Sequence, residues 1–346
     1  MAENLRVAVI GAGRMGADHI QRLHTRIHGA DVAAVVDIDL ERANAAVAHI
    51  PGAKAYASAA EAYESGDVNA VLIATPGFLH EVALLEALER DIPILCEKPL
   101  TPDAASAWKI VEAEQKLGHQ RIQVGFMRRF DEGYRELGGM VRSGDLGELL
   151  MLHCRHRNPD TPAGFTNEML INDSVVHEFD VIRYLTGEEI TSVQVRLGKA
   201  SSKAPSGQHD PQHVLIETTS GVLVDVEIFV NAQFGYQVLT EAAFEDGIVT
   251  IGGDSGPYVQ RAGRWGGEVT PGFEARFGAA YDVEVQAWVD AALRGGIGGP
   301  SAWDGYATAA CCEAGVEAQK SGEKVAVVLN EKPELYRAGA AAEAAK

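Results

Sequence analysis

The chain has 346 residues, 46% of them hydrophobic, a length that favours two domains with separate cores. Acidic residues outnumber basic ones by 49 to 30, and the formal net charge of -19 disfavours nucleic acid as a partner. The first residues show no signal-peptide pattern, no run is long enough to span a membrane, and the four cysteines show no disulfide or metal spacing, so we expect a cytoplasmic protein that binds no membrane.

The first predicted strand is Leu5 to Ile10, whose almost wholly apolar sequence is typical of a strand buried on both faces. A sequence of the form G-x-G-x-x-G follows at once: Gly11, Ala12, Gly13, Arg14, Met15 and Gly16. Gly11 allows a tight turn, Gly13 allows the backbone to approach a pyrophosphate, and Gly16 allows the next helix to pack closely. This pattern predicts a dinucleotide whose pyrophosphate lies at the N-terminus of that helix.

A second strand, Val32 to Val36, ends in Asp37, which lies about 20 residues beyond Gly16, as expected of an acid that binds the adenosine ribose. Its carboxylate would accept hydrogen bonds from the ribose hydroxyls and repel a 2'-phosphate. The next residue, Ile38, supplies no arginine to offset that repulsion. The predicted cofactor is therefore NAD rather than NADP.

Two further strands end in residues suited to a ligand, because ligands of open parallel sheets bind beyond the carboxyl ends of the strands. Asn69 to Ala74 leads into Thr75 and Pro76, whose hydroxyl and backbone can contact the cofactor. His80 either contacts the cofactor or caps the helix that follows.

The strand in Pro93 to Leu100 delivers Lys98 to the same edge of the sheet. By itself the Lys98-Pro99 pair also fits a surface loop. A last strand, Ile122 to Val124, completes a predicted Rossmann domain over residues 1–125, so the expected fold class is α/β for this part of the chain.

The pattern changes after Phe126, where β-branched segments separated by turn signals predict a second domain over residues 126–330. Hairpin turns at 219–221 and 245–247 indicate an α+β domain with a large, mostly antiparallel, open-faced sheet, one face of which can meet a partner subunit. Helices are expected at 280–293 and 302–320. The tail, 331–346, is expected to be a frayed helix or disordered.

A second candidate site lies in the helix expected to begin near Asn172. Asp173 and His177 are four residues apart, which places both on one helical face, where a carboxylate can orient an imidazole. An exposed ion pair is the common alternative for this spacing. Asp180 is either a further partner of His177 or a surface residue.

The chemistry of a dinucleotide assigns roles to these side chains. Oxidation of an alcohol sends a hydride to the nicotinamide while a base removes the hydroxyl proton, and His177 suits that base. Lys98 can donate to the reacting oxygen and lower the pKa of the alcohol, and Asp173 can position lysine, imidazole or a substrate hydroxyl. The histidines lack a clustered ligand spacing, so no metal is expected.

Four motifs occur together in the chain: the glycine-rich sequence followed by His19, Ala74-Thr75-Pro76 with His80, Glu97-Lys98-Pro99, and Asp173-x-x-x-His177. Together they resemble the glucose-fructose oxidoreductase, inositol dehydrogenase and rhizopine-catabolism family, over nearly the whole chain to about Leu329. The resemblance implies that Lys98, Asp173 and His177 are catalytic. It implies that Thr75, His80 and Glu97 contact the cofactor, and that the protein is a homotetramer assembled through the open sheets.

Two segments, 125–131 and 156–159, look most like the inositol 2-dehydrogenases of this family. This narrower resemblance implies that Met127 and Arg128 line the nicotinamide end of the pocket and that His156 and Asn158 bind substrate hydroxyls. It implies that Tyr236 closes the polyol site. Arg128 also fits a solvated charge, and Tyr236 an ordinary sheet aromatic. Tyr281 is a further candidate for a cofactor contact.

The implied reaction is the NAD-dependent oxidation of myo-inositol to 2-keto-myo-inositol (scyllo-inosose). Scyllo-inositol or a pyranose sugar is the alternative substrate, because one axial or equatorial hydroxyl alters hydrogen bonding without changing the chemistry. Two other classes are a glycosidase that retains NAD and a non-enzymatic NAD-binding regulator. The missing export signal disfavours the first, and the set of Lys98, Asp173 and His177 disfavours the second.

Overall fold

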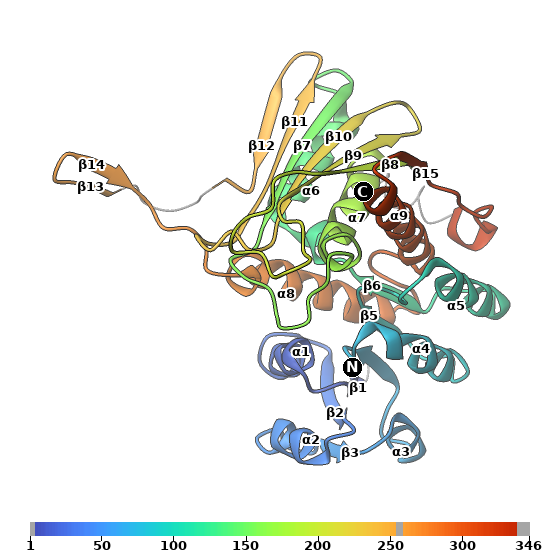
Figure 1. Ribbon diagram of the computed structural model, residues 1–346. Coiled ribbons are helices and arrows are strands. Elements are labelled where there is room, and N and C mark those ends of the chain that lie inside the picture. Colours follow the sequence, from blue (N-terminus) through green and yellow to red (C-terminus); the bar gives the residue numbers. More distant parts are fainter. Residues whose placement is uncertain (1–3, 254–258, 338–346) are drawn as a thin grey trace. The chain divides into compact units, whose positions relative to one another are not determined.

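The computed structural model describes residues 4–253 and 259–337 and divides them into two units (Figure 1). Residues 4–127, 281–309 and 329–337 belong to unit 1, and residues 128–253, 259–280 and 310–328 belong to unit 2. Two of the four boundaries fall inside long helices, α8 (Phe273–Ala292) and α9 (Ala302–Ser321).

Unit 1 contains a six-stranded parallel sheet in the order β3-β2-β1-β4-β5-β6. The strands are β1 (Leu5–Ile10), β2 (Ala30–Val36), β3 (Lys54–Tyr56), β4 (Ala70–Ile73), β5 (Ile94–Glu97) and β6 (Ile122–Gly125). Every residue of the central strand β4 is buried, as expected when a sheet is covered on both faces. This strand order is that of a dinucleotide-binding Rossmann fold, so the predicted fold of this part is confirmed.

Helices connect the parallel strands of unit 1. They are α1 (Arg14–Thr25), α2 (Leu40–Val47), α3 (Ala59–Glu64), α4 (His80–Leu88) and α5 (Ala104–Leu117), with a short 3-10 turn, η1 (Gly77–Leu79), before α4. Asp39, Ser58 and Asp103 cap α2, α3 and α5 through side-chain oxygens that accept backbone N–H groups. These caps fix where each helix begins relative to the strand before it.

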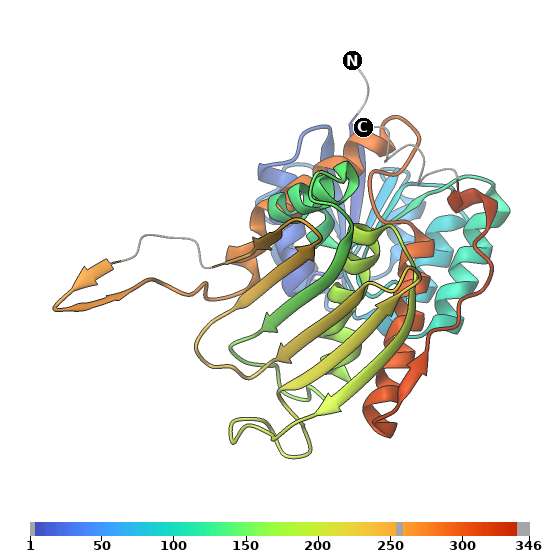
Figure 2. The ribbon, with the colours of Figure 1, turned by 90° about the horizontal axis from the view of Figure 1, so that it is seen from above.

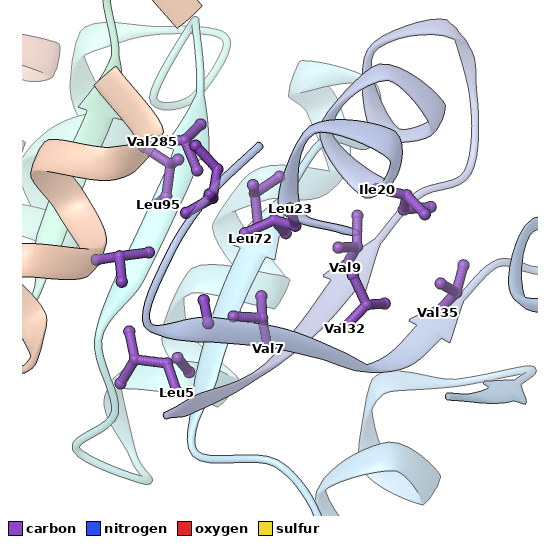
Figure 3. Packing of buried hydrophobic residues seen from close by; sticks show 14 of the residues in the cluster. Leu5, Val7, Val9, Ile20, Leu23, Val32, Val35, Leu72, Leu95 and Val285 are labelled. Atoms are coloured by element: carbon purple, nitrogen blue, oxygen red, sulfur yellow. The ribbon is translucent and has the colours of Figure 1, made fainter. Parts of the chain in front are cut away.

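The core of unit 1 recruits side chains from far along the chain. Val285, Trp288 and Val289 of α8 are fully buried in one cluster with Leu5 and Leu23, and Figure 3 shows Val285 among residues of β1, α1 and β5. The expected division at residue 125 therefore differs from the structure, in which residues 281–309 and 329–337 belong to unit 1. The reason is hydrophobic burial, which the second part of α8 supplies to this core.

The chain beyond residue 330 is anchored as far as it is described. The hydroxyl of Tyr336 donates to Glu114 at 2.7 Å, and the same carboxylate accepts the backbone N–H groups of Arg121 and Ile122 at 2.6 and 2.7 Å. Residues 331–337 are therefore held by unit 1 instead of forming a loose tail. The rest of the expected tail, 338–346, lies outside the described residues.

Unit 2 contains a seven-stranded sheet in the order β12-β11-β7-β10-β9-β8-β15. The strands are β7 (Leu149–Arg157), β8 (Ile190–Leu197), β9 (Gln212–Thr218), β10 (Leu223–Phe229), β11 (Gln237–Phe244), β12 (Ile248–Ile251) and β15 (Lys324–Ala326). All neighbouring pairs are antiparallel except β7 and β10, so the prediction of a mostly antiparallel sheet is confirmed. Figure 2 shows helices packed on one face of this sheet.

The other elements of unit 2 are mostly helical. They are η2 (Met127–Phe130, whose first residue belongs to unit 1), α6 (Glu132–Ser143), a π-helical turn η3 (Leu170–Val175), α7 (Val176–Thr186), and a small hairpin of β13 (Val259–Arg261) and β14 (Arg264–Gly266). The predicted helix start near Asn172 differs from the structure, because α7 begins only at Val176 and a π turn precedes it.

Candidate functional site

The turn between β1 and α1 is shaped for close approach of a ligand. Gly11 has a φ of +96°, and a Cβ atom there would lie 2.8 Å from the carbonyl oxygen of Ala74. A Cβ on Gly16 would lie 1.8 Å from the carbonyl oxygen of Gly11, whereas a Cβ on Gly13 would meet nothing within 4 Å. Gly11 and Gly16 are therefore needed for close packing, whereas Gly13 faces open space at the N-terminus of α1, where an anion is favoured.

Asp37 is buried at the end of β2 and holds the glycine-rich turn. Its Oδ2 accepts the backbone N–H of Ala12 at 2.9 Å, and its Oδ1 accepts that of Asp39 at 2.9 Å. Arg42 on α2 lies 3.3 Å from the same carboxylate, a neighbour that the sequence analysis missed because it considered only Ile38, which is 94% exposed. A guanidinium therefore does lie beside the predicted ribose-binding acid, and it also pairs with Asp39.

His80 links the two loops that follow β4 and β5. Its Nε2 lies 2.8 Å from the carbonyl oxygen of Thr75, and its Nδ1 lies 2.7 Å from that of Pro99. The ring is fully buried, and burial lowers the pKa of His80 although both carbonyls and Glu97 oppose that effect. His80 is the first residue of α4 and makes no capping bond, so the alternative role as a helix cap is wrong.

Thr75 fits a cofactor contact through its side chain. Its Oγ1 atom is buried and has no hydrogen-bond partner among the described residues. A hydroxyl in this state normally finds a partner, which a bound dinucleotide would provide. Together with the open space at Gly13, this orphaned oxygen shows that unit 1 fits NAD.

Glu97, Lys98 and their neighbours form the other end of this site. Oε1 of Glu97 lies 2.7 Å from Nε2 of His19 on α1, and Oε2 accepts the backbone N–H of Lys98 at 3.2 Å. The Lys98-Pro99 peptide is cis. Tyr281 packs edge-on against His19, with ring centroids 5.9 Å apart. The structure thus brings Glu97, Lys98 and Tyr281 into one region of unit 1, joined by His19.

Two predicted substrate residues of unit 2, Arg128 and His156, contact a carboxylate that was not assigned from the sequence. Glu178 accepts a hydrogen bond from Nη1 of Arg128, and its Oε2 lies 3.1 Å from Nδ1 of His156. We call Arg128, His156 and Glu178 the buried triad, because each is at most 3% exposed. The ring of His156 lies 6.4 Å from that of His177 and 6.3 Å from that of Tyr236.

Arg128 is therefore not the solvated charge that the sequence also allowed, and Tyr236 is buried directly before β11. Burial alone would lower the pKa of Arg128, but Glu178 outweighs it and raises that pKa. Burial raises the pKa of Tyr236, which stays a neutral hydroxyl. The sequence did contain a signal for Glu178. It directly follows His177, and the apolar Val176 and Phe179 nearby indicate that this part of the helix is buried.

Asn158 and Asp173 occupy special backbone positions. Asn158 follows β7 and donates its backbone N–H to Phe229 at 2.9 Å, while its side-chain Oδ1 is buried without a hydrogen-bond partner among the described residues. Asp173 lies in the π turn η3, so its four-residue spacing to His177 is not that of a regular α-helix. π turns occur often at functional sites.

Asp180 and Arg129 are buried together. Arg129 donates to both carboxylate oxygens of Asp180, with the shortest contact at 2.7 Å, and Asp180 is 1% exposed. Asp180 is therefore not a surface residue. The remaining predicted positions are divided between the units: Met127, which is buried, and Lys98 belong to unit 1, whereas Asp173 and His177 belong to unit 2.

A separate hollow of about 590 Å³ lies on the seven-stranded sheet. It is lined by side chains of β7, β9, β10, β11 and β12, among them His153, Arg155, His213, Asp225 and Glu227. Along β7, His153 and Arg155 of this hollow alternate with the buried Cys154 and His156, so the two pairs of side chains point to opposite faces of the sheet. None of the predicted catalytic residues lines it.

Within residues 4–253 and 259–337, no helix has both the length and the apolar character needed to cross a membrane. The same residues contain no group of three or more histidine, cysteine, aspartate or glutamate side chains that could hold a metal ion.

Comparisons with known proteins agree across the two parts of the chain. Residues 5–126 match the family model described as "Oxidoreductase family, NAD-binding Rossmann fold", and residues 134–250 match the "GFO/IDH/MocA C-terminal domain". The chain is 79% identical to an inositol 2-dehydrogenase of Arthrobacter sp. (strain FB24), over 97% of this chain and 100% of the relative. It is 78% identical to inositol 2-dehydrogenase 1 of Paenarthrobacter aurescens (strain TC1), with the same coverage.

One solved structure is similar over almost the full length. The crystal structure of myo-inositol dehydrogenase from Lactobacillus casei in complex with NAD(H) and myo-inositol has a TM-score of 0.93 and 36% sequence identity. The match covers 96% of this chain and 100% of that chain.

Proposed function

Because the chain belongs to the GFO/IDH/MocA family of NAD-binding oxidoreductases, we propose that it oxidises a cyclic polyol, myo-inositol to 2-keto-myo-inositol (scyllo-inosose). The observation that carries the choice of substrate is the buried triad beside His177 and Tyr236, which offers several fixed donors and acceptors to a ring of hydroxyls. The names of the relatives support the same substrate class.

NAD, when bound, accepts a hydride from the substrate carbon. His177 takes the proton of the reacting hydroxyl, so that the carbon–oxygen bond becomes a carbonyl. Lys98 donates a hydrogen bond to that oxygen and stabilises its developing charge, and Asp173 holds the reacting groups in position. Glycines 11, 13 and 16, Asp37 and Thr75 bind the nucleotide.

The substrate hydroxyls are bound by unit 2 residues in this proposal. His156 and Asn158 contact hydroxyls, Arg128 and Met127 border the nicotinamide end, and Tyr236 closes the pocket. The buried Oδ1 of Asn158 supports a ligand contact, because a polyol hydroxyl would satisfy it. In this scheme His80, Glu97 and Tyr281 are further contacts of the cofactor.

The cellular setting and assembly belong to the same proposal. All four cysteines are buried and none is in a disulfide, which suits the reducing cytoplasm. Leu215 and Leu223 are exposed on the sheet face that carries the hollow, which suits contact with another subunit of a homotetramer.

The test is the absorbance of reduced cofactor with a panel of inositols and pyranose sugars, measured with NAD and NADP in parallel. We expect signal with NAD and inositols, and the ratio of kcat/KM for myo- and scyllo-inositol decides between the isomers. The measurements with NADP show whether Arg42, which lies beside Asp37, weakens the preference for NAD over NADP that Asp37 is expected to give. No signal with any alcohol would reject the proposed function.

A further inference from the structure

Glu178 is a buried carboxylate that the proposed reaction does not use. It follows His177 on α7, is 1% exposed, and contacts both other members of the triad. Nη2 of Arg128 lies 3.1 Å from Nδ1 of His156, so the three side chains form a closed set of contacts. They come from η2, β7 and α7, and His156 and Arg128 precede Glu178 by 22 and 50 residues in the chain.

Glu178 stays ionised in this setting. Burial alone would raise its pKa, but the charge of Arg128 and the hydrogen bond and charge of His156 outweigh burial and lower the pKa of Glu178 to about 2. A buried ion pair commonly adds little stability compared with apolar side chains of the same size. A role in binding therefore accounts better for these charges than stability does.

Glu178 also determines which ring nitrogen of His156 is available. Nδ1 of His156 lies 3.1 Å from Oε2 of Glu178 and 3.1 Å from Nη2 of Arg128, and it can hydrogen-bond only one of them, since it either donates its proton or accepts one. The carboxylate favours a proton on Nδ1, which then donates to Glu178, and the guanidinium, itself only a donor, packs beside the ring without a hydrogen bond to it. A neutral imidazole then carries its lone pair on Nε2, at the other edge of the ring, where it can accept a hydrogen bond from a hydroxyl.

We propose that Glu178 is a positioning residue for polyol binding, which acts by holding His156 and Arg128 and not by touching the substrate. The inference rests on the proposed function, in which His156 contacts substrate hydroxyls and Arg128 borders the nicotinamide end of the pocket. Groups fixed before binding lose less conformational freedom when the substrate arrives. Loss of Glu178 should therefore raise KM for the polyol more than it lowers kcat.

The first measurement compares Glu178→Gln with the wild-type chain. The amide keeps the shape of the side chain and removes its charge, so we expect KM for myo-inositol to rise roughly 10- to 100-fold, the range for lost charge-assisted hydrogen bonds. We expect kcat to fall by less than about 10-fold. The affinity for NADH, measured by fluorescence titration, should be unchanged, because the nucleotide ligands lie in unit 1.

Asp180→Asn is the matched control. Asp180 lies on the same helix, is equally buried and forms an ion pair with Arg129, the neighbour of Arg128. It has no part in the proposed site, so this variant should lower Tm while KM stays at the wild-type value. An equal rise of KM in both variants would overturn the inference, because any broken ion pair on α7 would then have the same effect.

A double-mutant cycle tests whether Glu178 acts through His156. If it does, the double variant should have nearly the same KM as His156→Ala alone. If the two residues act independently, the fold increases in KM of the two single variants should multiply in the double variant. Should Glu178→Gln fail to fold, the paired variant Arg128→Met with Glu178→Met leaves no isolated buried charge and should keep a Tm near the wild-type value.

Wild-type KM in folded Glu178→Gln, or in the paired variant, would overturn the inference while the proposed function stands. If instead the wild-type chain reduces no NAD with any polyol, the proposed function is what fails.

Discussion

Asp37 and Glu178 are both buried carboxylates, and their different partners give them different tasks. Asp37 accepts the backbone N–H groups of Ala12, in the glycine-rich turn, and of Asp39, the residue that caps α2, so it fixes backbone. Glu178 accepts hydrogen bonds from side chains of two distant elements, so it fixes other side chains. The same functional group, a buried carboxylate, therefore has a proposed role in nucleotide binding in one unit and in substrate binding in the other.

Replacement of the two proposed reacting side chains should abolish most turnover. We expect Lys98→Ala and His177→Ala each to lower kcat by roughly 100- to 10,000-fold, because each removes proton transfer or charge stabilisation at the reacting oxygen. Circular dichroism and Tm should show a folded protein in both. Lys109→Ala, at an exposed lysine of α5 paired with Glu81, is the matched control and should keep wild-type rates.

Wild-type turnover in either the Lys98 or the His177 variant would reject the role assigned to that residue.

Acid should destabilise the protein through Glu178. Its pKa of about 2 in the folded chain lies below the ordinary value of 4.5, because Arg128 and His156 outweigh burial. A lowered pKa contributes stability that is complete above pH 4.5 and is lost as pH falls toward 2. Calorimetry should show Tm falling more steeply over this range in the wild type than in Glu178→Gln, which cannot titrate there. Equal slopes would contradict this prediction.

At the scale of elements, the β1–α1 turn was predictable because its chemistry is local. A strand, three glycines and a helix follow one another without a gap, and this local order was enough to predict the turn, although Ala74 and Asp37 also contact it from farther along the chain. The parallel order of the strands and the hairpins of unit 2 were predictable for the same reason. Patterns of apolar residues and turn residues act over a few neighbours.

The π turn η3 and the buried triad were not predictable from local pattern. Residues 170–175 carry no sequence feature that separates a π turn from an α-helix. Arg128 and Glu178 are 50 residues apart, and the sequence around each of them does not indicate that they form an ion pair. The short strand β3 and the hairpin β13–β14 were missed because three residues are too few to show a period.

The two glycines of the β1–α1 turn should respond differently to alanine. Gly16→Ala places a Cβ 1.8 Å from a carbonyl oxygen, so we expect a large loss of Tm. Gly13→Ala meets nothing within 4 Å and has no strained φ, so Tm should be unchanged while KM for NAD rises, since the methyl group occupies the space of the pyrophosphate. Equal NAD affinity in Gly13→Ala would contradict the proposed binding mode.

At the scale of the whole molecule, the exposed face of the seven-stranded sheet should mediate assembly. Light scattering of the wild-type chain should give about four times the mass of one chain. Leu223→Glu should yield smaller species, because Leu223 is 46% exposed on β10 and a carboxylate there opposes burial. Val82→Glu, at an exposed valine of α4, is the control and should leave the mass unchanged. A monomeric wild type would reject the tetramer.

The core of unit 1 is discontinuous in the chain, and this affects how the protein can be divided. A fragment that stops at Met127 keeps all six parallel strands but lacks Val285, Trp288 and Val289, so it would leave an apolar gap open to water. Chimaeras that exchange nucleotide specificity between relatives must therefore transplant three separate stretches, 1–127, 281–309 and the segment from 329 onward. If only the first stretch were exchanged, the core of unit 1 would combine side chains of one relative with the α8 side chains of another, and these would not be matched in shape.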